Sequence, residues 1–245
     1  RLGASLARIQ ETGRFGIDFL AKDIRMVGYQ GCIDPETLSV NIIADNPPTT
    51  NLFESALRGF EVTNNAWAAG EEFDNTAIET DALIGSDVIA IQRASVGSAV
   101  PTGQLANFTA QIQITNNNMG FVQNDIVIIA DCESADMFRI SNNPSGGVIN
   151  LAHADNVNDG NNLSALYDTA ANIMSFQSVV YFVRDTGRTN SRGDAINALF
   201  RQTDNLINNA TANFNIEELV EGVDSLQILY GERLASGNIH YVPAD

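Results

Sequence analysis

Apolar and small residues near the start of the chain recur at steps of three and four positions. They are Leu2, Leu6, Ile9, Gly13, Gly16, Ile17, Leu20, Ile24 and Val27. In a helix of 3.6 residues per turn this spacing places them on one stripe, while charged residues take most of the other face. The pattern predicts one continuous amphipathic helix within residues 1–30. We expect Leu20 and Ile24 to be deeply buried against the rest of the protein.

Beyond the helix, shorter hydrophobic patterns predict a body made mostly of β-strands. Residues 87–94 and 110–115 alternate apolar and polar side chains, which predicts strands with one solvent-facing side. Residues 125–130 form a continuous apolar run, which is typical of a more deeply buried strand. Further strands are predicted at residues 38–44, 137–140, 148–151, 177–184, 195–202 and 225–230.

The order of these elements indicates the fold class and the domain organisation. A long helix followed by many antiparallel strands is the α+β pattern. No internal repeat and no linker rich in proline and serine interrupts the sequence. We therefore predict a helical segment in residues 1–30 and one β-rich domain in residues 31–245.

The composition excludes several classes of protein. Of the 245 residues, 44% are apolar and 18% are charged, as in a globular chain. The formal net charge is −17 and the 13 basic residues are scattered, which argues against binding to nucleic acid or to anionic lipid. The sequence contains no run of about 20 apolar residues that would span a membrane.

Residues able to carry out catalysis are sparse. His153 and His240 lie in polar or terminal segments without HExxH-like spacing, and the sequence has no GxSxG, Walker A or GxGxxG motif. We therefore expect no catalytic residue, and we interpret both histidines as solvated surface residues.

A calcium site is the alternative interpretation of one polar loop. Asp155, Asn158 and Asp159 would supply the carboxylate and amide oxygens that Ca²⁺ prefers. Val157 occupies the place where an EF-hand carries its second ligand, so a polar turn without a metal or other cofactor is the default. The acidic run within residues 71–81 is interpreted as a solvated loop.

Three blocks of the sequence resemble the PilW-type minor pilins of bacterial type IV pili. The first is RIQETGRFGIDFLAKDIRMVGYQGC at residues 8–32, where the family has an Arg-(Ile/Leu)-Gln-Glu start and an Asp-Ile-Arg-Met-x-Gly-Tyr-x-Gly-Cys end. The others are IVIIADCESADMF at residues 126–138 and ELVEGVDSLQILYG at residues 218–231. Shorter similarities occur at GSDVIAIQR, residues 85–93, and ALFRQ, residues 198–202. The blocks follow the family's order along the chain.

The resemblance implies a fold, a function and a set of partners. It implies a pilin-like α+β fold in which the N-terminal helix packs on an antiparallel sheet, with an elaborated β-rich body. The implied function is that of a structural minor pilin, not an enzyme, in a tip or priming complex with other minor pilins and the major pilin. The residues implied for packing in the filament are Leu2, Leu6, Ile9, Gly13, Gly16, Ile17, Leu20 and Ile24.

The resemblance also implies a location in the cell. In the family an apolar membrane helix runs directly into the amphipathic half, whereas this sequence opens at Arg1 in mid-helix. We therefore interpret it as the soluble part of a protein that is anchored in the bacterial inner membrane, faces the periplasm and later enters the pilus at the cell surface. A complete soluble protein with an ordinary N-terminal helix is the alternative.

Cys32 and Cys132 are the only two cysteines, and both fall at matching positions of the family. In an exported protein an even pair most simply forms a disulfide. Closing a loop of this length would stabilise the fold by about 4–5 kcal/mol in the chain-entropy model. The alternative is two buried free thiols in a cytosolic protein.

Other functions stay open beside pilus assembly. A pilus-tip adhesin or lectin-like module would bind a ligand through the Asn-rich loops, such as those at residues 116–120 and 142–147. A minor pseudopilin of a type II secretion system would keep the assembly role in another machine. A secreted hydrolase is disfavoured because no triad or paired metal site is recognisable.

Overall fold

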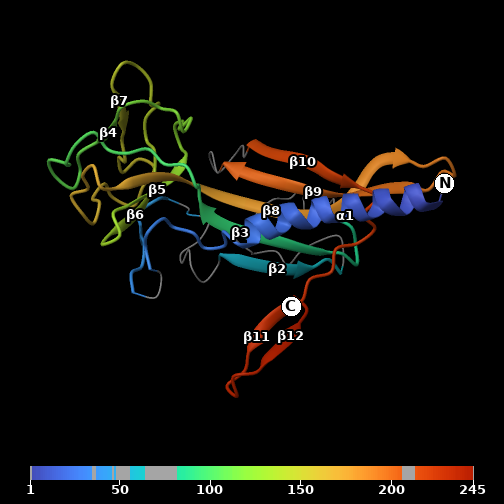
Figure 1. Ribbon diagram of the computed structural model, residues 1–245. Helices are drawn as coiled ribbons and strands as arrows, with labels where there is room; N and C mark the ends of the chain where they lie inside the picture. The colour runs from blue at the N-terminus through green and yellow to red at the C-terminus, as the bar shows by residue number, and fades with distance from the viewer. Residues whose placement is uncertain are drawn as a thin grey trace.

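The computed structural model describes residues 2–34, 37–45, 47, 56–63, 82–205 and 213–244. These residues contain one helix, α1 (Leu2–Ile24). It is continuous, as predicted, but it ends before Val27, the last residue of the predicted stripe, which lies in a turn. The strands are β1 (Asn41–Ile42), β2 (Leu57–Glu61), β3 (Asp87–Ala94), β4 (Ile112–Ile114), β5 (Ile126–Ala130), β6 (Ala135–Arg139), β7 (Ile149–Leu151), β8 (Asn172–Thr189), β9 (Ala195–Asn205), β10 (Asn213–Glu221), β11 (Tyr230–Arg233) and β12 (Ile239–Val242). Figure 1 shows α1 lying lengthwise beside β8, β9 and β10.

The 18-residue strand β8 organises the main sheet because two different strands share one of its edges. Residues 172–175 of β8 pair with β5, and residues 178–189 pair with β9. The opposite edge pairs with β3 over residues 176–181. Beyond these neighbours, β6 and β1 follow β5, β2 follows β3, and β10 follows β9. The sheet therefore branches in the middle of β8.

Both faces of the sheet are covered at β3, so every residue of that strand is buried. On one face, Ile89 and Ile91 join a cluster with Tyr181 of β8. On the other face, Val88 and Ala90 join a separate cluster. The alternating pattern had predicted one solvent-facing side for this strand. That prediction is wrong because protein covers both sides.

The chain between β3 and β8 forms a lobe at one end of the molecule, at the left of Figure 1. Here β4 and β7 pair as a separate two-stranded sheet, while β5 pairs with β6. Ile112, Phe121, Phe138 and Leu151 belong to a cluster of buried side chains that fills the lobe. The lobe therefore has a hydrophobic core of its own.

The hairpin of β11 and β12 projects from the body (Figure 1). The ring of Tyr230 at its root lies so close to Gly59 of β2 that a Cβ atom at Gly59 would collide with it. Just before the hairpin, the backbone N–H of Ile228 donates a 2.6 Å hydrogen bond to the Asp87 carboxylate. The exposed apolar residues of this region are Leu229, Leu234, Ile239 and Tyr241.

The predicted pilin-like α+β fold is wrong. The described residues contain a single helix and a strand-rich body that is divided over several sheets, and this architecture does not fit a pilin-like fold. There are two physical reasons. One edge of β8 pairs first with β5 and then with β9, and the lobe that contains β4 and β7 has a separate hydrophobic core. Local hydrophobic patterns predict strands but not these partners.

Most predicted strands occur, with changed ends. The bounds of β3 agree with the prediction, whereas only Asn41–Ile42 of the strand predicted at residues 38–44 is a strand. The strand predicted at residues 225–230 is wrong, because regular pairing starts only at Tyr230. No strand was predicted at β2, β10 or β12, and only Tyr230 of β11 falls within a predicted strand.

Candidate functional site

The two long sides of α1 have different surroundings, and this difference defines the candidate site. Gly16 is buried, and a Cβ atom on it would lie 3.3 Å from side-chain carbons of Leu199 and Val220. Phe19 and Leu20 pack against the cluster formed by β3, β8 and β9. The missing side chain at Gly16 therefore allows α1 to approach β9 and β10 closely.

Asp23 fixes this body-facing side of α1 through a buried network. The residue is 3% exposed, and its carboxylate accepts a 2.6 Å hydrogen bond from the Tyr181 hydroxyl. Arg93 donates to it at 3.2 Å, and Arg201 donates at 3.1 Å through Nε. Two guanidinium groups offset the cost of burying the carboxylate. Because the partners lie on β3, β8 and β9, one side chain joins the helix to three neighbouring strands.

The pKa of the Tyr181 hydroxyl is raised in this network. Burial raises the pKa of the Tyr181 hydroxyl, and its hydrogen bond to the Asp23 carboxylate raises it further. Arg201 acts in the opposite direction but does not cancel these effects. The hydroxyl therefore stays protonated and keeps donating to Asp23 across the physiological pH range.

The other side of α1 presents apolar side chains to solvent. Ile17 is 67% exposed and Ile24 is 39% exposed, and a Cβ atom at Gly13 would meet nothing within 4 Å. At helical spacing these three residues share one stripe. We call Gly13, Ile17 and Ile24 the uncovered stripe. Phe15, which is 49% exposed, lies on another side of the helix and contacts Phe19 edge to face.

The predicted deep burial of Leu20 and Ile24 is wrong. Leu20 is half-buried and Ile24 is exposed, because the helix turns Gly16 and Asp23 toward the sheet instead. Gly16 therefore contacts the body of this chain and does not belong to the uncovered stripe. The side chains of three further predicted packing residues, Leu2, Leu6 and Ile9, lie outside the described residues.

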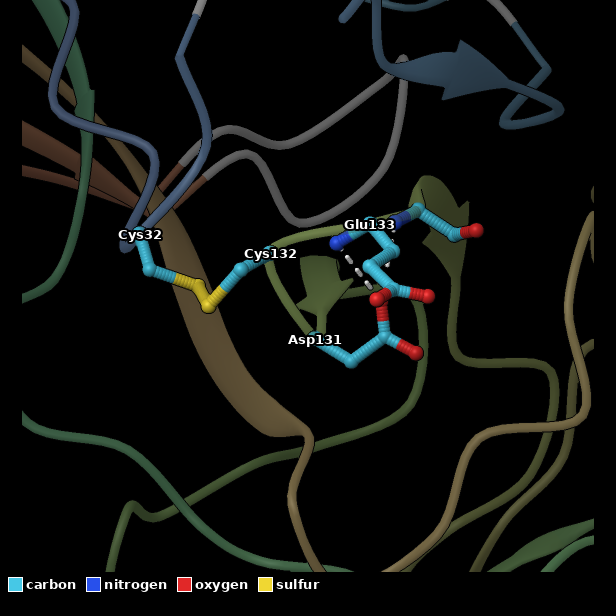
Figure 2. The surroundings of a disulfide bond; sticks show 5 residues. Cys32, Asp131, Cys132 and Glu133 are labelled. Atoms are coloured by element: carbon cyan, nitrogen blue, oxygen red, sulfur yellow. Dashed lines mark hydrogen bonds between the residues drawn. A yellow bond between two sulfur atoms is a disulfide. The ribbon is translucent and has the colours of Figure 1, made fainter.

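A disulfide joins the segment after α1 to the turn between β5 and β6. Cys32 and Cys132 are bonded, with Cα atoms 5.0 Å apart, which confirms the predicted bridge over free thiols. Figure 2 shows the turn, in which the Asp131 carboxylate accepts hydrogen bonds from the backbone N–H groups of Glu133 and Ser134. Cys132 has a φ of 73°, a left-handed conformation that this turn imposes on it.

The three residues considered for calcium do not converge as ligands. Asn158 is buried, and its amide bonds both backbone groups of Arg139, accepting at 2.7 Å and donating at 2.9 Å. It therefore ties the loop to β6. Asp155 and Asp159 are exposed. Across the described ranges, no group of three or more His, Cys, Asp or Glu side chains is arranged to hold a metal ion.

The two histidines differ from each other. His240 on β12 is exposed, as predicted. His153 is only 2% exposed, so the prediction of a solvated residue is wrong for it. Its Nε2 lies 2.9 Å from the carbonyl oxygen of Ala110, and its ring packs edge to face on Phe138. The acidic run within residues 71–81 lies outside the described residues.

Three buried carboxylates, those of Asp23, Asp87 and Asp136, are not among the predicted site residues. Asp136 accepts hydrogen bonds from the Ser164 backbone and hydroxyl and, at 2.6 Å, from the Tyr167 hydroxyl. Asp23 carried a detectable signal, because it stands at helical spacing after Leu20 on a stripe that is otherwise apolar. Asp136 follows a turn, and its local sequence gives no comparable sign.

No protein-family model, curated protein or solved structure matches this chain. Within the described residues, no helix combines the length and the apolar character needed to cross a membrane.

Proposed function

We propose that this protein is a structural minor pilin that takes part in type IV pilus assembly through protein–protein contact. The observation that carries the proposal is the uncovered stripe of α1. Ile17 and Ile24 leave apolar surface in water along a helix whose Gly16 and Asp23 contact the body. Burial against a neighbouring subunit would gain about 1.5–3 kcal/mol for a fully covered isoleucine.

Gly13 leaves space on the uncovered stripe for a second helix to approach closely. Nothing lies within 4 Å of the position that a Cβ atom would take there. Small residues allow two helix backbones to approach closely, and close approach strengthens dispersion contacts between them. The partners proposed for this stripe are helices of other minor pilins and of the major pilin.

The segments that resemble minor pilins support the proposal because they meet around α1. The first and second blocks are joined by the disulfide between Cys32 and Cys132. The first and third meet where Gly16 faces Val220. The two shorter similarities contain Arg93 and Arg201, the guanidinium partners of Asp23. The family-like residues thus form one set of contacts that holds α1, although the overall fold is not pilin-like.

The same proposal includes a place of action. A disulfide persists in an oxidising compartment such as the bacterial periplasm or the cell surface. We propose that the protein is held at the inner membrane before assembly and resides in the pilus afterwards, with no catalytic activity of its own.

Replacing Ile17 with Asp in the native gene tests the proposal. A carboxylate buried between helices without a partner is costly, so surface pili should fall several-fold when counted by electron microscopy. The purified variant should melt within a few degrees of the wild-type protein, because position 17 faces solvent in the isolated chain. The matched control is Val148→Asp, at another exposed apolar position in the β4–β7 lobe, and it should leave pilus numbers unchanged.

Normal piliation in cells that contain the Ile17→Asp protein would refute the assembly role of the stripe. Normal pili combined with impaired protein secretion would instead identify the pseudopilin alternative. Immunoblotting of the same cells checks that the variant protein accumulates to the wild-type level.

A further inference from the structure

Two neighbouring pockets flank the loop that follows β3, and no role has yet been assigned to them. One has a volume of about 290 Å³, and the other about 350 Å³. Ser98 lines both, so the pockets adjoin each other. The first also includes residues of the loop at 116–120, one of the Asn-rich loops of the sequence. Their sizes lie near the lower end of the range for small-molecule sites.

The chemistry of the lining is uncharged in both pockets. The polar side chains are Ser98, Thr115, Asn116 and Asn118 in the first, and Tyr29, Ser98 and Asn172 in the second. No lining residue is Asp, Glu, Lys or Arg, although the chain carries 30 acidic and 13 basic residues. A charged ligand would find no counter-ion here. The lining suits a neutral ligand.

Hydroxyl and amide groups both donate and accept hydrogen bonds, as do the hydroxyl groups of a sugar. Each pocket also has an apolar component, Met119 in the first and Met174 in the second. Tyr29 adds an aromatic ring to the second pocket. Apolar and aromatic side chains pack against the C–H faces of sugar rings, so the lining matches both kinds of saccharide surface.

The loop that separates the pockets is held in place before any ligand arrives. The Ser98 hydroxyl donates a 2.8 Å hydrogen bond to Asn172 Oδ1. Ala99 and Ile173 exchange backbone hydrogen bonds of 2.8 and 2.9 Å. This hydrogen bond joins two residues of the pocket lining to each other. A preformed site loses little conformational entropy on binding.

The opposite wall of the first pocket is also ordered. Asn117 bonds both backbone groups of Phe121, with its amide donating at 2.7 Å and its oxygen accepting at 2.8 Å. The Asn118 backbone N–H donates to Asn116 Oδ1 at 3.2 Å. These bonds hold the loop that carries Thr115, Asn116 and Asn118, three residues of the pocket lining.

We propose that the two pockets around Ser98 bind a neutral saccharide. The site is independent of the uncovered stripe on α1. Loss of saccharide binding therefore leaves pilus assembly intact, and the failure of either proposal does not decide the other.

Nuclear magnetic resonance titration of the whole 15N-labelled chain tests the site. The probes are lactose, maltose and N,N′-diacetylchitobiose. At least one should produce saturable shifts at the amides of Ser98, Asn172 and residues 115–119, with weak, millimolar-range affinity. Sialyllactose, which carries a carboxylate, should bind more weakly than lactose because the site has no counter-ion for it.

Two variants examine the lining directly. Thr115→Val keeps the side-chain shape but removes a hydroxyl, and Asn116→Leu removes an amide of similar size. The loss of a hydrogen-bonding group should weaken binding about tenfold. The matched control Asn162→Leu changes an exposed asparagine away from both pockets and should bind as the wild-type protein does.

The proposal is overturned if none of the three neutral disaccharides gives saturable shifts, or if the shifts map to another surface. It is equally overturned if Thr115→Val and Asn116→Leu both bind with wild-type affinity. Binding of an uncharged Ser/Asn peptide without any sugar binding would assign the pockets to a protein partner instead.

Discussion

The hydroxyl of Tyr181 donates a 2.6 Å hydrogen bond to the carboxylate of Asp23, which links α1 to the middle of β8. The two residues are 158 positions apart in the sequence. Arg93 and Arg201 complete the surroundings of the same carboxylate. The orientation of α1, and with it the direction in which the uncovered stripe faces, thus depends on one buried acidic side chain.

Replacing Asp23 with Ala should destabilise the protein strongly. The change leaves the largely buried guanidinium groups of Arg93 and Arg201 without their counter-ion. Removing one partner of a buried ion pair typically costs about 3–5 kcal/mol of folding free energy. Urea denaturation measures the free energy of unfolding. Asp18→Ala, at an exposed position of the same helix, is the control and should change it by less than about 0.5 kcal/mol. A loss below about 1 kcal/mol for Asp23→Ala would show that the network contributes little.

Alkaline pH should destabilise the fold through its buried tyrosines. Burial raises the pKa of Tyr230 to about 12, and the nearby Asp87 carboxylate contributes to the rise. In an unfolded chain the pKa of tyrosine is about 10. Because the folded protein holds the Tyr230 proton more tightly than the unfolded chain does, the free energy of unfolding is at its full value below about pH 10. It falls as the pH rises from there through the pKa of Tyr230 in the folded protein.

The Tyr230→Phe variant isolates this contribution. It removes a buried hydroxyl oxygen that has no hydrogen-bond partner, so it should be neutral or stabilising at pH 7. Urea melts of the two proteins across the alkaline range should show a shallower decline for Tyr230→Phe. Identical declines would mean that Tyr230 does not titrate as its burial predicts.

Two glycines of α1 should respond oppositely to substitution. Gly13→Ala should stabilise the isolated chain by about 0.5–1 kcal/mol, because alanine favours the helix and the site is open. Gly16→Leu should cost about 1–3 kcal/mol, because the new side chain would press on Leu199 and Val220. Thermal melts of both variants check the pair, and a stabilised Gly16→Leu would contradict the packing of α1 on β10.

Hydrophobic periodicity predicts the presence of α1 but not which of its sides is buried. The 3.6-residue pattern correctly predicts a continuous helix, because apolar spacing is a local property of the sequence. It does not indicate which part of a wide apolar stripe meets the body. Gly16 and Asp23 set that contact. The pattern includes Gly16 but does not distinguish it from the exposed Gly13 and Ile17, and Asp23 is charged.

For the strands too, the sequence pattern predicts local bounds but not burial or pairing. The bounds of β3 agree with the alternating pattern, yet both faces of β3 are buried. The branching of β8 depends on pairing between residues far apart in the sequence, so no local window predicts it. The pockets around Ser98 also combine distant segments, from Tyr29 to Met174. The sequence predicts the Asn-rich loop at residues 116–120 as a possible binding element, but it does not indicate that Ser98, Ala99 and Val100 line the same pocket.

Removing the disulfide should lower stability without changing the fold. Cys32 and Cys132 close a separation of 100 residues, and the loss of a native disulfide typically costs about 2–5 kcal/mol. The double variant Cys32→Ser/Cys132→Ser should therefore unfold at lower urea concentration while keeping its circular dichroism spectrum. Wild-type protein reduced under native conditions is the matched comparison. It should show the same loss, since both treatments free the unfolded chain from the same constraint. If the reduced protein keeps the stability of the oxidised one, the link between the end of α1 and the β5–β6 turn adds nothing to the contacts already made by Asp23.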